Sequence, residues 1–105
     1  MNKIAVLKEL KDKLNKNLKN TIKEVILFGS QVTNNTHKYS DYDILIIVDT
    51  KLTPELKDHI ISICYDIDLK YDILTDTHIL STKDLDTLKG KQPIFTNAMN
   101  NGIHV

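Results

Sequence analysis

The sequence Asp41-Tyr42-Asp43-Ile44-Leu45-Ile46-Ile47-Val48 decides the fold of this chain, together with Val25-Ile26-Leu27-Phe28-Gly29-Ser30 shortly before it. Each contains a short apolar run rich in β-branched residues, which predicts a strand. The second run is apolar at every position after the aspartates, as in a strand that is covered on both faces. Because side chains alternate along a strand, we expect Asp41 and Asp43 on one face and Tyr42 packed on the other.

The aspartate pair and the Gly29-Ser30 pair together predict a site for phosphate chemistry. Neighbouring carboxylates repel each other, and a divalent cation removes that penalty. A tight turn at Gly29-Ser30 would expose backbone N–H groups that can bind phosphate oxygens. A metal-binding pair beside a phosphate-binding turn is typical of phosphoryl or nucleotidyl transfer.

The composition predicts one small globular domain, residues 1–105, in the cytoplasm. A chain of 105 residues has room for a single core. Fourteen basic residues balance fourteen acidic ones, so bulk charge gives no reason to expect nucleic-acid or membrane binding. The single cysteine, Cys64, falls among isoleucines at helical spacing, which predicts a buried, inert thiol. The polar start, Met1-Asn2-Lys3-Ile4, does not match a secretory signal.

Hydrophobic periodicity and turn residues predict a small α/β domain. We expect helices at residues 3–18, 30–36, 54–68 and 93–101, a short helix after Ser81, and strands at residues 25–28, 41–48 and 71–80. Thr53 is the expected N-cap of the second long helix, and Ser81 with Asp84 suits a capping box. The last helix is expected to bury Ile94, Phe95 and Met99.

The segments Leu27-Phe28-Gly29-Ser30-Gln31-Val32 and Tyr39-Ser40-Asp41-Tyr42-Asp43-Ile44-Leu45-Ile46 resemble the minimal nucleotidyltransferases, short prokaryotic proteins of the superfamily that includes DNA polymerase β. The resemblance implies the nucleotidyltransferase fold, an α/β (α+β) domain with a small mixed sheet of three to four strands and helices packed on it. One segment departs from the pattern: Thr33-Asn34-Asn35 stands where family members usually have Arg-Gly. Asparagine tolerates left-handed backbone, so we expect the turn to persist without the arginine's contribution to nucleotide binding.

The resemblance also implies a metal site. Asp41 and Asp43 would hold Mg²⁺ ions, and a third carboxylate from the next strand would complete the site and take the proton of the attacking hydroxyl. The candidates are Asp76 and Asp72. We favour Asp76, because an unpaired carboxylate in mid-strand is costly, whereas one at a strand entrance is ordinary.

The phosphate-binding residues follow from the same resemblance. Gly29 is expected to allow close backbone approach, and Ser30 to contact the β- and γ-phosphates of a nucleoside triphosphate. Ser40 is a candidate to orient Asp41 by a hydrogen bond, and a purely turn-forming serine suits the sequence equally well. Three further residues, His37, Lys38 and His78, are candidate phosphate or metal auxiliaries, but each is more often a surface residue or a strand neighbour, so they receive no role.

These features predict a magnesium-dependent nucleotidyltransferase that transfers AMP from ATP to a hydroxyl acceptor and releases pyrophosphate. The resemblance implies that the acceptor belongs to a helical HEPN-type toxin encoded nearby, with this chain as the antitoxin. One alternative is a catalytically degenerate protein that neutralises its partner by binding alone, which the Thr33-Asn34-Asn35 segment favours. Another, a metal-dependent phosphohydrolase, is less favoured because the sequence shows no His–Asp cluster beside the aspartate pair. No direct nucleic-acid contact is expected, and a homo-oligomer is compatible with the sequence, which fixes neither the acceptor nor the preferred base.

Overall fold

The computed structural model describes residues 2–29 and 41–105 of the chain. Their elements follow in the order α1 (Lys3–Asn17), β1 (Ile22–Phe28), β2 (Tyr42–Val48), α2 (Pro54–Tyr71), β3 (Thr75–Ser81), the 3₁₀ helix η2 (Thr82–Asp86), α3 (Pro93–Asn101) and β4 (Ile103–His104). The helix expected at residues 30–36 lies outside the described residues. Among the described helices, none combines the length and the apolar character that a membrane span requires.

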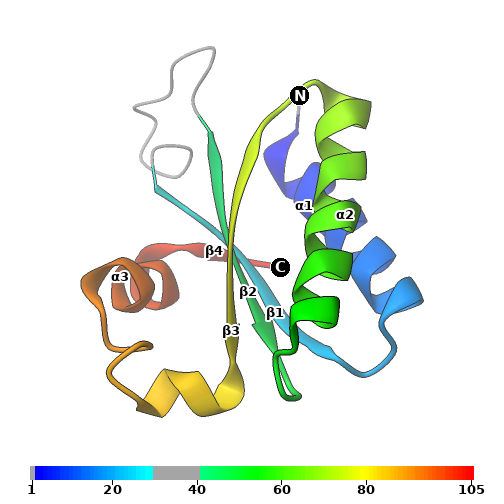
Figure 1. The fold of residues 1–105 in the computed structure, drawn as a ribbon. Helices are drawn as coiled ribbons and strands as arrows, with labels where there is room; N and C mark the ends of the chain where they lie inside the picture. The colour runs from blue at the N-terminus through cyan, green and yellow to red at the C-terminus, as the bar shows by residue number, and fades with distance from the viewer. Residues whose placement is uncertain (1, 30–40) are drawn as a thin grey trace.

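The described strands form one mixed sheet in the order β3-β2-β1-β4. Strand β1 runs antiparallel to β2 and to β4, whereas β2 runs parallel to β3. Helices α1 and α2 pack on one face of the sheet, and α3 packs on the other (Figure 1). The predicted fold class, a small mixed sheet with helices packed on it, is therefore confirmed.

Strand β2 is buried on both faces, as its apolar sequence predicted. Its even-numbered residues, from Tyr42 to Val48, join the core formed with α1 and α2. Leu45 and Ile47 point to the opposite face and join the smaller core with α3. Burying one such side chain contributes about 1.5–3 kcal/mol to folding. Because its residues enter both cores, β2 stabilises the packing on both faces of the sheet. Cys64 lies buried in the α1–α2 core, and burial raises the pKa of its thiol, in agreement with an inert residue.

The boundary between α2 and β3 differs from the prediction. The N-cap is confirmed, since the Thr53 hydroxyl accepts a hydrogen bond from the Leu56 N–H. Helix α2 continues to Tyr71 instead of ending near residue 68, and Asp72 ends it in the left-handed conformation, with φ 53°. Asp68 stabilises the turn, because its carbonyl accepts from the Ile73 N–H and its carboxylate from the Thr75 N–H. The strand therefore begins at Thr75 and not at residue 71.

The C-terminal part confirms the predicted caps and adds a strand. Ser81 and Asp84 form the expected capping box of η2, and α3 has the expected bounds. Within α3, Phe95 is buried, whereas Ile94 is 42% exposed, so its predicted burial is wrong. After α3 the chain pairs with β1 as the short strand β4. The sequence did not predict this strand, because a run of two residues carries no recognisable pattern.

Candidate active site

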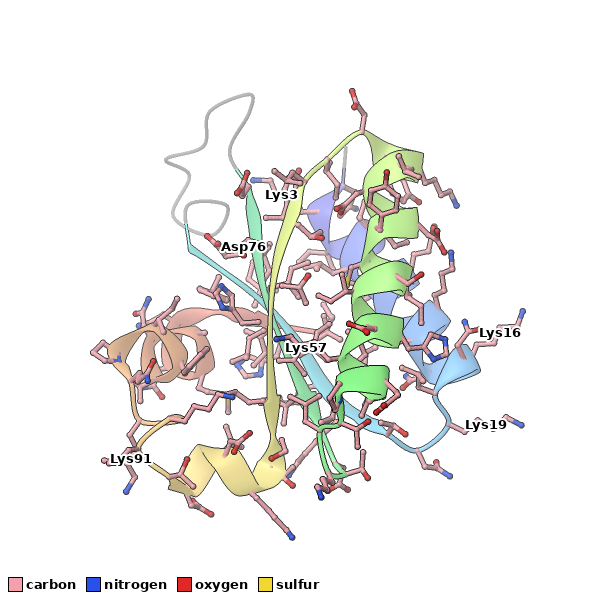
Figure 2. The ribbon with its side chains drawn as sticks, in the orientation of Figure 1. Lys3, Lys16, Lys19, Lys57, Asp76 and Lys91 are labelled. Carbon is pink, nitrogen blue, oxygen red and sulfur yellow. The ribbon has the colours of Figure 1, made fainter. Side chains whose placement is uncertain are left out.

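The ends of three strands bring the predicted acidic residues together. Because β1 is antiparallel to β2 and β2 is parallel to β3, the end of β1 lies beside the starts of β2 and β3. The register pairs Phe28 with Asp43 and Asp43 with Asp76. Figure 2 shows the Asp76 side chain at this edge of the sheet, above α3 and on the side of β3 that faces away from α2.

Asp43, Asp76 and His78 form one cluster. A ligand atom from each of the three lies within 4.8 Å of the others, as around a single metal ion. The Nε2 atom of His78 lies 3.6 Å from an Asp76 carboxylate oxygen. Asp43 is half-buried and Asp76 exposed, so the cluster runs from the sheet interior to its surface. Two oxygen donors and one nitrogen donor with access to solvent form a donor set that fits a divalent cation.

The electrostatics of the cluster favour a bound cation. Burial raises the pKa of the Asp43 carboxyl, and the nearby charges of Asp76 and Asp41 raise it further, while His78 acts in the opposite direction. Ionisation of Asp43 is therefore less favourable than that of a free aspartate when no cation is present. A divalent cation would compensate the carboxylate charges and reverse this penalty.

Gly29 follows β1 with a φ of +78° and faces the carboxylate of Asp43. Side chains rarely adopt this backbone conformation. A Cβ atom at this position would also overlap the Asp43 Oδ2 atom. Both constraints explain why the residue that closes β1 is a glycine, and why its backbone can approach whatever the carboxylates bind.

The ring of His78 packs against two aromatic side chains. Its centroid lies 5.7 Å from that of Phe28 and 6.0 Å from that of Phe95, the latter in an edge-on arrangement. Sequence reasoning assigned His78 no role and stated that no His–Asp cluster accompanies the aspartate pair. That statement is wrong. The available signal was the alternation of β3, which places residues 76 and 78 on the same face.

The remaining predicted site residues fall in two groups. Asp41 is exposed and lies just before β2. Asp72, the alternative third carboxylate, caps α2 and does not belong to β3. Ser30, Ser40 and the Thr33-Asn34-Asn35 segment lie outside the described residues. The roles assigned to all of them, and the choice of Asp76 as third carboxylate, stay predictions.

Comparison with known proteins identifies the family. A family model described as a nucleotidyltransferase domain matches residues 7–95. The chain belongs to this nucleotidyltransferase family. Nucleotidyl transfer is therefore its enzymatic chemistry, and the resemblance that the Gly-Ser and Asp-x-Asp segments indicated is confirmed.

Two relatives of this nucleotidyltransferase come from Methanocaldococcus jannaschii. One, provisionally named protein adenylyltransferase MJ0141, is 41% identical over 71 residues, which cover 68% of this chain and 72% of the relative. The other, provisionally named protein adenylyltransferase MJ0604, is 29% identical over 102 residues, which cover 97% of this chain and 96% of the relative. The second match extends over nearly the whole length of both proteins.

Solved structures share the fold of this nucleotidyltransferase. A toxin–antitoxin structure with AMP-PNP superimposes with a TM-score of 0.60 at 16% identity, over 92% of this chain and 69% of that one. A mutant of the toxin–antitoxin MntA-HpeT gives a TM-score of 0.59 at 14% identity, with the same coverage. At these identities the likeness concerns the fold.

Proposed function

We propose that this nucleotidyltransferase transfers AMP from ATP to a hydroxyl group of a partner protein, and that it acts as the antitoxin of a toxin–antitoxin pair in the cytoplasm. The main support is the alignment of Asp43 with Asp76 across β2 and β3, facing the glycine that closes β1. The provisional names of the two relatives support AMP as the transferred group and protein as the acceptor.

The carboxylates of this chain would hold the metal of the reaction. Asp41, Asp43 and Asp76 offer hard oxygen donors at one sheet edge, and the raised pKa of Asp43 marks a place where positive charge is favoured. A divalent cation such as Mg²⁺, when bound, would neutralise triphosphate charge and polarise the α-phosphate. Mg²⁺ is usually bound by a few carboxylates together with substrate phosphates and water, which agrees with a site that offers only a few protein ligands.

The residues themselves would bind the nucleotide and take up a proton. The acceptor hydroxyl forms a bond to the α-phosphorus, the bond from that phosphorus to the bridging oxygen breaks, and pyrophosphate leaves. The hydroxyl proton passes to the exposed carboxylate of Asp76. Gly29 would let the phosphates approach the backbone, and Ser30 would contact the β- and γ-phosphates. Ser40 would orient Asp41 in this scheme.

The partner in this proposal is a helical HEPN-type toxin. The resemblance to minimal nucleotidyltransferases supports that identity, and toxin–antitoxin structures share the fold. Helix α2 offers a surface for such a partner, since Ile61, Tyr65 and Leu69 recur every four residues on its outer face and are 41%, 59% and 65% exposed. Exposed Lys57 lies four residues before Ile61 and continues this spacing, and exposed Asp58 follows it, so the N-terminal end of the stripe carries both signs of charge. We therefore expect it to bind the apolar face of a helix of the partner.

The test is to incubate the chain with labelled ATP and Mg²⁺, with and without the protein encoded beside it. The proposal predicts a mass increase of one AMP on that protein. Modification of small molecules with none on the protein would contradict the choice of acceptor. Tight binding of the partner without modification would support instead the antitoxin that acts by contact alone.

The docking surface has its own test and a matched control. Tyr65→Ala and Leu69→Ala should each weaken the complex with the neighbouring protein by about tenfold, as truncation of an exposed apolar contact at an interface does. Leu88→Ala removes a side chain that is 87% exposed outside α2, and should leave the complex unchanged. Equal effects of all three variants would exclude the outer face of α2 as the interface.

A further inference from the structure

His78 occupies a position that the proposed function does not use. It lies two residues after Asp76 on the same side of β3, and its Nε2 atom approaches the Asp76 carboxylate to 3.6 Å. The same cluster includes a carboxylate oxygen of Asp43, with every ligand atom within 4.8 Å of the other two. The imidazole therefore lies where it could share an ion with both aspartates.

The surroundings of His78 restrict the orientation of its ring. It packs against Phe28, the last residue of β1, and Phe95, in α3, at 5.7 and 6.0 Å between ring centroids. Both phenylalanines are buried in the α3 core. The side chain of His78 keeps 27% of its surface exposed. A ring already restricted by packing loses little conformational entropy on binding an ion.

The nature of the donors determines which ions this cluster prefers. Mg²⁺ takes oxygen ligands almost exclusively, and an imidazole adds little to its binding. Neutral imidazole suits first-row transition ions such as Fe²⁺, Ni²⁺ and Zn²⁺, and Mn²⁺, which prefers carboxylates, still accepts an imidazole more readily than Mg²⁺ does. Two carboxylates and one neutral imidazole balance the charge of a divalent ion, while triphosphate oxygens could complete its coordination.

We propose that His78 is a metal ligand beside Asp43 and Asp76, and that it makes this site selective for a divalent transition metal, with Mn²⁺ bound more tightly than Mg²⁺. This inference rests on the proposed function, since it concerns the cation of the same site. Mg²⁺ would still bind through the carboxylates, but more weakly. A plain ion pair between His78 and Asp76 does not explain the cluster as well, because a half-exposed pair at 3.6 Å contributes little.

The direct test uses the parent protein and Mn²⁺ alone. Pulsed electron paramagnetic resonance of bound Mn²⁺ should reveal modulation from a ¹⁴N nucleus, the signature of imidazole coordination. His78→Gln should abolish the ¹⁴N signal. Bound Mn²⁺ with no ¹⁴N modulation in the parent would overturn the inference, whatever the variants do.

Metal titrations by calorimetry give the second readout. We expect the parent to bind Mn²⁺ at least about tenfold more tightly than Mg²⁺, and His78→Gln to lower Mn²⁺ affinity by about tenfold with a change below about threefold for Mg²⁺. His59→Gln, at an exposed position on α2, is the matched control and should change neither affinity. Equal losses of both metals in His78→Gln would show that the residue acts on packing and contradict the inference.

The outcomes separate this inference from the proposed function. If Mn²⁺ and Mg²⁺ bind through Asp43 and Asp76 and transfer proceeds, but His78→Gln leaves their affinity ratio unchanged, only the role of His78 is contradicted. If the parent binds neither ion, with or without ATP, the metal site of the proposed function is contradicted together with its selectivity.

Discussion

The two faces of β2 belong to the same seven residues, but they are covered to different extents. On one face, the even-numbered residues from Tyr42 to Val48 are all buried under the two long helices α1 and α2. On the other, α3 covers Leu45 and Ile47, while Asp43 at the start of the strand stays half-buried beside Asp76 and His78. The face under α1 and α2, the closed face, stabilises the sheet. At the start of the other face the described residues leave Asp43 half-buried and Asp76 exposed, and we call this the uncovered end of β2.

The largest effect should come from the uncovered end. Asp76→Asn keeps the shape of the side chain but removes the charge needed for metal binding and proton uptake, so transfer should fall by about 10²- to 10⁴-fold. Asp72→Asn is the matched control, because Asp72 caps α2 outside the strand, and should stay within about twofold of the parent. Single-turnover AMP transfer to the partner measures both. A dead Asp72→Asn with an active Asp76→Asn would reverse the assignment.

A substitution on the closed face should affect stability instead of chemistry. Ile46→Ala removes a fully buried side chain from the α1–α2 core and should cost about 2–5 kcal/mol in the free energy of unfolding. Asp41→Ala, at an exposed position, should leave the melting temperature in EDTA unchanged or higher, since it removes repulsion on Asp43. Urea unfolding compares the two. A large loss of stability in Asp41→Ala would mean that this aspartate is structural.

Gly29→Ala should affect both properties. The positive φ costs a residue with a side chain about 1–2 kcal/mol, and the added Cβ overlaps Asp43. We expect lower stability together with weaker metal and nucleotide binding. Gly90→Ala provides a comparison away from the site, since its Cβ would meet the backbone of η2 and should reduce stability alone. Equal nucleotide binding in parent and Gly29→Ala would contradict the close-approach role of Gly29.

The smallest effect concerns the sheet edge far from the site. His104 in β4 makes a 2.7 Å hydrogen bond to Glu24 and a 3.0 Å hydrogen bond to the Met99 carbonyl, and its pKa is raised chiefly by Glu24. A raised folded-state pKa stabilises the fold below about pH 6.5, and this contribution disappears as pH rises through the folded-state value. Glu24→Gln should therefore lower the melting temperature by about 2 °C at pH 6, since the pair is partly exposed, and by less at pH 9. A pH-independent difference would rule out this coupling.

Much of the fold, and part of the candidate site, could be predicted from the sequence, because the signals for them are local. The uninterrupted apolar run after Asp43 indicated a strand covered on both faces, and Thr53, Ser81 and Asp84 marked helix starts through hydrogen bonds that span three residues. The aspartates and Gly29 were recognisable as a site because their spacing matches a family pattern. Their proximity to Asp76 followed from treating residues 71–80 as the next strand, although its true start differs.

What the sequence did not indicate depends on tertiary contacts. Asp72 was counted in a strand because the left-handed turn that ends α2 is stabilised by Asp68, which lies in the helix itself. Strand β4 has two residues and forms because β1 offers a free edge. The alternation of β3 could place His78 on the face of Asp76, but its contacts with β1, β2 and α3 depend on the tertiary fold.

The central claim, that the uncovered end of β2 is a cation-dependent nucleotide site, is tested most directly by melting the parent and Asp43→Asn with and without Mg²⁺ and ATP. Burial and neighbouring carboxylates raise the pKa of Asp43, so its ionisation destabilises the fold progressively as pH rises from the unfolded-state pKa to the folded-state pKa, and fully above the latter. In EDTA at pH 7, Asp43→Asn should therefore melt at a temperature equal to or above that of the parent. Mg²⁺ with ATP should raise the melting temperature of the parent and leave the variant unchanged. A variant that is strongly destabilised in EDTA, or stabilised by Mg²⁺ and ATP as much as the parent, would contradict the claim.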